Sequence, residues 1–124
     1  MATLVQTQAD LAAALTAVTA GTVRTLPVSP AKAGDGWVNI GKITPAATSM
    51  TKVDVTFTCV LVLGADARAA AAQLPTLARP LIDAVTTGPF HPDGVSVEPA
   101  TLPAGDSAPG DLYALILTLN LECD

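Results

Sequence analysis

The sequence predicts a single α+β domain over residues 1–124, in which two helices cover one face of a mostly antiparallel sheet of four or five strands. Three observations lead to this prediction. The 124 residues are enough for one domain. Two long runs of β-forming residues, 53–63 and 111–123, alternate in polarity. Two alanine- and leucine-rich segments, 5–19 and 67–86, have helical spacing, and the expected order is α-β-β-β-α-β-β.

The first expected helix spans residues 5–19 and ends before Gly21. Thr7 and Asp10 have the spacing of a capping box, in which side chains bond the free N–H groups at a helix start. The larger apolar residues recur on one helical face: Leu4, Leu11, Leu15 and Val18. A short strand over 22–28 should follow, and Pro27 restricts it to an edge or an end.

Residues 37–43 and 53–63 are expected to form a hairpin with a long polar tip. The tip begins at Thr44 and includes Ser49 and Met50. Exposed loops often carry contacts, so these three residues are candidates for contact with a neighbouring subunit or partner. A loop that makes no contacts is an equally acceptable interpretation.

The strand over residues 53–63 has apolar residues at all odd positions, so one of its faces should cover the core. Its even positions begin polar and end apolar, and the last strand, 111–123, has the reverse order. Antiparallel pairing would join the apolar ends into one patch on the second face. This patch is the main candidate for a partner surface, although burial under a helix or loop is an alternative interpretation. Its members are Val60, Val62, Leu112, Ala114 and Ile116.

The second expected helix spans residues 67–86, with Asp66 as its N-cap. Pro75 and Pro80 each remove a backbone donor, which predicts a kink or a division into two short helices. A strand over 95–102 and a loop over 103–110 follow, and Asp106 and Ser107 of that loop are further contact candidates. The apolar stripe of the helix should face the sheet: Leu74, Leu77, Leu81, Ile82 and Val85.

Charge and residue chemistry exclude several classes of function. The net charge is −5 and the six basic residues are dispersed, which argues against direct binding to a phosphate backbone. His91 has no partner in a catalytic pattern, and Cys59 and Cys123 lack metal-ligand spacing. We therefore expect buried free thiols and assign no catalytic residue, metal or cofactor, so the chain is not expected to be an enzyme.

The segment lengths and the scarcity of charge indicate where the protein works. No apolar run approaches the about 20 residues of a membrane helix, and the N-terminus lacks a basic signal-peptide region. A cytoplasmic protein without membrane contact is expected. The mean hydropathy is +0.49, so burial of part of the surface in an oligomer is favoured. A compositional bias toward alanine is the alternative explanation.

After the leading alanine- and leucine-rich helix, five segments follow in a characteristic order: residues 60–66 (VLVLGAD), 68–71 (RAAA), 81–83 (LID), 95–98 (VSVE) and 112–121 (LYALILTLNL). In this order, and over nearly the whole chain, the sequence resembles the tail terminator (tail-completion) proteins of long-tailed bacteriophages, especially those that infect actinobacteria. It departs from the family pattern at Pro75 and Pro80 in the second helix.

The resemblance implies a virion protein, assembled in the bacterial cytoplasm, that forms a hexameric ring at the head-proximal end of the tail tube. The ring would end tube polymerisation and bind the head–tail connector, and DNA would pass through it without sequence-specific binding. Another phage neck component is the nearest alternative. A small cytoplasmic ligand-binding α+β domain is a more distant one.

Overall fold

The computed structural model describes residues 3–19, 21–25, 34–46, 51–87, 90, 92–103 and 111–123. The helices and strands have the predicted order, α-β-β-β-α-β-β. Their bounds are α1 Leu4–Val18, β1 Thr22–Arg24, β2 Asp35–Pro45, β3 Val53–Gly64, α2 Ala67–Thr86, β4 Gly94–Pro103 and β5 Asp111–Cys123.

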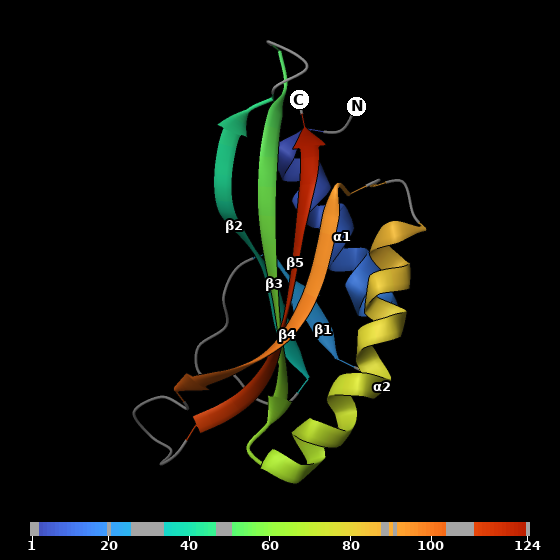
Figure 1. The fold of residues 1–124 in the computed structure, drawn as a ribbon, viewed down its shortest axis with the longest axis vertical. Coiled ribbons are helices and arrows are strands. Elements are labelled where there is room, and N and C mark those ends of the chain that lie inside the picture. Colours follow the sequence, from blue (N-terminus) through green and yellow to red (C-terminus); the bar gives the residue numbers. More distant parts are fainter. Residues whose placement is uncertain are drawn as a thin grey trace.

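The strands form one five-stranded sheet in the order β1-β2-β3-β5-β4. β2, β3, β5 and β4 pair antiparallel, whereas the short β1 pairs parallel to β2, so the sheet is mixed. Figure 1 shows both helices on the same side of this twisted sheet. The predicted α+β architecture, with two helices on one face, is confirmed.

The main core lies between the helices and what we call the first face, the side of the sheet to which the odd-numbered residues of β3 point. The strict alternation of β3 produces this arrangement, because alternate side chains project to opposite faces. Leu11 and Leu15 of α1 and Leu81 and Val85 of α2 pack against it. The strands contribute Val38, Val55, Phe57, Cys59, Leu61, Leu115, Leu117, Leu119, Leu121 and Cys123.

Helix α1 begins earlier than the sequence predicted, and the capping box assigned to Thr7 and Asp10 is wrong. Thr3 is the N-cap, and its hydroxyl accepts a hydrogen bond from the backbone N–H of Gln6 at 3.3 Å. Thr7 is instead buried within the helix, and the Cys123 thiol donates to its hydroxyl at 3.7 Å. Val18, assigned to the core face, is 37% exposed because the buried stripe ends at Leu15.

Two polar side chains of α1 bond the edge strands. The Thr16 hydroxyl accepts from the Val23 N–H at 3.0 Å, and its single proton is shared between the Ala12 carbonyl at 2.8 Å and the Val23 carbonyl at 3.3 Å. The Gln8 amide donates to the Val38 carbonyl at 2.7 Å and to the Thr25 carbonyl at 3.1 Å. These bonds pair backbone groups of residues 23, 25 and 38 with side chains of α1, so β1 is held by the helix as well as by β2. Residues 26–28, the rest of the expected strand, lie outside the described part.

Helix α2 is continuous from Ala67 to Thr86 and contains both prolines. Figure 1 shows its axis bending between the first and second halves, so the kink is confirmed and the division into two helices is not. Asp66 caps it as predicted, accepting from the backbone N–H groups of Arg68 and Ala69 at 2.9 and 3.3 Å. None of the helices in the described ranges is both long and apolar enough to cross a membrane.

Candidate functional site

The face of the sheet opposite the helices, which we call the second face, changes in polarity along the strands. Its side chains stand in rows because residues directly opposite each other on antiparallel strands point to the same side. In the polar half, the Thr56 hydroxyl donates to the Asn120 side-chain oxygen at 2.7 Å. One complete row of short polar residues crosses β2, β3, β5 and β4: Asn39, Thr58, Thr118 and Ser96.

The apolar half of the second face contains a small buried cluster separate from the main core. Trp37, Val60, Val62 and Ala114 form this second-face cluster, and their exposed fractions lie between 1% and 8%. Leu112 and Ile116 are half-buried and pack against it. The predicted strand pairing is confirmed, because Val60 pairs with Ile116 and Val62 with Ala114.

Because this cluster is buried, its members differ in whether they can contact a partner. Val60 and Val62 are almost inaccessible within the single chain, so they hold β3 against its neighbours. A partner at this end of the sheet would first meet the more exposed side chains of Leu112 and Ile116. Of the candidate contact residues, the structure brings together these four and Ala114.

The remaining candidates lie elsewhere. Thr44 is half-buried near the far end of β2, opposite Asp54 of β3, so it is remote from the second-face cluster. Ser49, Met50, Asp106 and Ser107 lie outside the described residues. His91 does too. The hairpin that carries Thr44 is confirmed by the pairing of β2 with β3.

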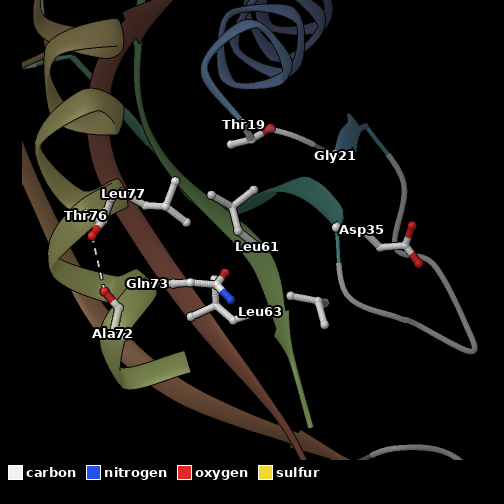
Figure 2. A pocket seen from close by; sticks show the side chains of 11 residues that line it. Thr19, Gly21, Asp35, Leu61, Leu63, Ala72, Gln73, Thr76 and Leu77 are labelled. Carbon is white, nitrogen blue, oxygen red and sulfur yellow. Dashed lines mark hydrogen bonds between the residues drawn. The ribbon is translucent and has the colours of Figure 1, made fainter. Parts of the chain in front are cut away.

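A pocket that the sequence did not predict lies between the first half of α2 and the end of β3 (Figure 2). Its volume is about 660 Å³. Figure 2 shows Gln73 and Leu77 of α2 pointing toward Leu61 and Leu63 of β3. Thr19 also lines the pocket, and its buried hydroxyl oxygen has no hydrogen-bond partner among the residues that the structure describes. The lining is thus mostly apolar, and its polar side chains are those of Thr19, Asp35, Gln73 and Thr76.

Two glycines shape the side of this pocket formed by β1 and β2. A Cβ on Gly21 would lie 1.8 Å from the Gly34 carbonyl oxygen, which accepts from the Thr22 N–H at 3.0 Å. Gly34 has φ +92°, a conformation that other L-residues rarely adopt. These glycines allow β1 to lie beside β2. No pattern in the sequence indicated this close approach, because the two positions are joined only by the fold.

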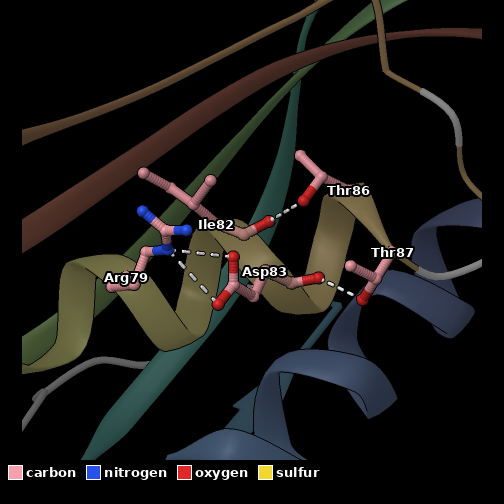
Figure 3. Close-up of polar contacts among 5 residues, drawn as sticks. All are labelled: Arg79, Ile82, Asp83, Thr86 and Thr87. Carbon is pink, nitrogen blue, oxygen red and sulfur yellow. Dashed lines mark hydrogen bonds and ion pairs between the residues drawn. The ribbon is translucent and has the colours of Figure 1, made fainter.

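The exposed end of α2 carries a group of polar contacts (Figure 3). Arg79 Nε lies 3.2 Å from Asp83 Oδ1, one helical turn away, and both side chains are mostly exposed. The Thr86 hydroxyl donates to the Ile82 carbonyl at 2.8 Å, and the Thr87 hydroxyl donates to the Asp83 carbonyl. These bonds close the helix end locally, so we assign no binding role to this group.

The two cysteines are buried in the main core. Burial raises the pKa of Cys59 to about 12, so its thiol remains protonated at neutral pH and is a poor nucleophile. Cys123 is also buried, and its thiol donates to the Thr7 hydroxyl. Cys59 and Cys123 stand opposite Leu117 and Val53, so the two thiols lie well apart along the ladder and form no disulfide. Among the residues that the structure describes, no group of three or more His, Cys, Asp or Glu is placed to hold a metal ion.

Comparison of the chain with protein-family models and with curated proteins finds no match. A functional interpretation therefore depends on the fold and on the surfaces described above.

Proposed function

We propose that this chain is a structural virion protein of a long-tailed bacteriophage, a tail terminator that forms a hexameric ring at the head-proximal end of the tail tube. The ring would stop tube polymerisation and bind the head–tail connector protein on its other side. Its partners would be further copies of the chain, the tail tube protein and the connector. It would be assembled in the bacterial cytoplasm and would remain in the virion.

The observation that carries this proposal is a sheet face that neither helix covers, in a fold with the element order of the resemblance. A ring protein needs surface for neighbours on several sides, and a two-layer domain leaves one face of its sheet available for them. The polar half of the second face consists largely of hydroxyl and amide side chains, which suit a wet contact.

Charge supports the passage of DNA through the ring without binding. The chain has a net charge of −5, and its basic residues are separated along the sequence. Within the second face, Lys52 lies 3.5 Å from Glu122, so part of the positive charge there is neutralised. A surface of this kind does not supply the clustered lysine and arginine contacts that hold phosphates.

Two alternatives have different support. Another phage neck component would use the same second face of the sheet, and location in the particle separates it from a terminator. A ligand-binding domain is favoured by one observation, the 660 Å³ pocket with its unsatisfied Thr19 hydroxyl. Mass spectrometry of the purified, denatured protein tests that alternative. A small molecule that is retained by the wild type and lost from Leu77→Trp would support it.

Location in the particle tests the main proposal. The protein is tagged at its C-terminus, particles are purified from a lysate on a density gradient, and the tag is imaged by electron microscopy. We expect label at the junction of head and tail. Protein that stays at the top of the gradient, with no label on any particle, would contradict the virion role.

A further inference from the structure

Each lateral edge of the sheet has a stretch without a neighbouring strand among the described residues, and the two stretches lie at the same level along the strands. β1 covers only the beginning of β2, where Thr22–Arg24 pair with Asp35–Trp37. The Gln8 side-chain amide then donates a hydrogen bond to the Val38 carbonyl. Beyond that point, the outer edge of β2 has no strand partner in the described part of the chain. β4 is the last strand on the other side, so its outer edge also lacks a strand within the described residues.

The open parts of these two edges lie at the same level of the sheet. Following the register across β3 and β5, Asn39 of β2 stands in the row of Ser96 of β4, and Lys42 stands in the row of Gly94. Pro99 has no N–H and would interrupt a ladder, but it stands in the row of Gly36, where β1 already closes the edge. Pro45 ends β2 but stands beyond the row of Gly94, so the matching stretch, residues 39–42 of β2 and 94–96 of β4, contains no proline.

The two edges carry opposite charge. Asp93, just before β4, and Glu98 within it are exposed, and residues 92–103 contain no basic residue. On the other side, Lys42 and Arg24 are exposed, and the acidic residue of β2, Asp35, is buried. The opposite charges also lie in the same rows of the sheet. Glu98 lies in the row of Trp37, and Trp37 is paired with Arg24. Asp93 is adjacent to Gly94, in the row of Lys42.

We propose that copies of this chain associate head to tail, with the open edge of β2 in one copy beside the first half of β4 in the next. β2 and β4 run in opposite directions, so copies related by rotation about the strand direction would meet antiparallel. Pairing β2 with β2 would bring Lys42 near Lys42, and pairing β4 with β4 would bring acid near acid. Only the heterologous contact joins opposite charges, and such a contact generates a ring when the rotation between neighbouring copies closes.

This contact would be the interface between neighbouring subunits of the ring proposed above. The inference rests on that proposal only for the closure of the ring. It is tested with two charge reversals, Lys42→Glu and Asp93→Lys. Each variant alone would bring like charges together at every contact. An equimolar mixture restores every contact if the two variants alternate, because the introduced lysine of one variant then meets the introduced glutamate of the other. Arg68→Glu, an exposed position on α2, is the control with the same charge change as Lys42→Glu.

Sedimentation velocity measures association, and native mass spectrometry identifies the species in the mixture. We expect the wild type and Arg68→Glu to associate, each edge variant to associate at least about tenfold more weakly, and the mixture to recover with both chains in each oligomer. Single variants that associate like the wild type overturn the proposal, as does a mixture that stays dissociated. A wild type that is monomeric at every concentration overturns it too. Label at the head–tail junction in particles made with these variants would reject this interface while leaving the virion role intact.

Discussion

Replacing Val62 by alanine should destabilise the single chain by about 2 kcal/mol, because Val62 belongs to the buried second-face cluster. Val62 is 3% exposed, so nearly all of its side chain is removed from water on folding. The substitution deletes two methyl groups. At about 0.8 kcal/mol for each buried carbon, the transfer free energy is roughly 1.6 kcal/mol, and the cavity left in the cluster adds a few tenths of a kcal/mol.

Urea unfolding at low protein concentration, followed by circular dichroism, measures this loss apart from any effect on association. The midpoint should fall with an unchanged slope, since the slope reports the surface exposed on unfolding. Ile43→Ala is the matched control, because Ile43 is also an aliphatic strand residue but is 51% exposed. If Val62→Ala costs no more than Ile43→Ala, the cluster is not a second core. The apolar half of the face would then be an open surface, as one interpretation of the sequence expected.

Three further predictions concern single residues. Thr3→Ala should lower the free energy of unfolding by about 1 kcal/mol through loss of the α1 cap, and thermal unfolding that matches the wild type would show that the cap is dispensable. Gly21→Ala should cost more than Gly94→Ala in the same assay, since its Cβ would meet backbone at 1.8 Å whereas that of Gly94 would meet a side chain at 3.7 Å; equal costs would contradict this close approach. Burial raises the pKa of Cys59 from 9.0 to about 12, so the protonated thiol is favoured in the folded state and stability should fall as pH rises from 9 toward 12. Cys59→Ala should remove a slope of about 1.4 kcal/mol per pH unit from the dependence of the free energy of unfolding on pH. An identical pH dependence in the wild type and in Cys59→Ala would contradict this prediction.

The strand pairing was predictable because it follows from local alternation. Both long strands change polarity along one face, and antiparallel pairing is the arrangement that places Val60 beside Ile116 and keeps Thr56 near Asn120. The start of α1 was not predicted correctly, because Thr3 with Gln6 and Thr7 with Asp10 offer similar spacing. Tertiary packing decided between them by burying Thr7 beside Cys123.

The sequence by itself determined the element order, the core face of β3, the cap at Asp66 and the bend of α2, since each depends on residues close together in the chain. Only the tertiary structure decided that Val60 and Val62 are buried, that a pocket forms beside α2, and that Lys42 and Gly94 share a row. Those features depend on strands brought together from distant parts of the chain. Periodicity assigns a side chain to a face of its own strand, whereas the order of strands in the sheet sets what that face and its edges meet.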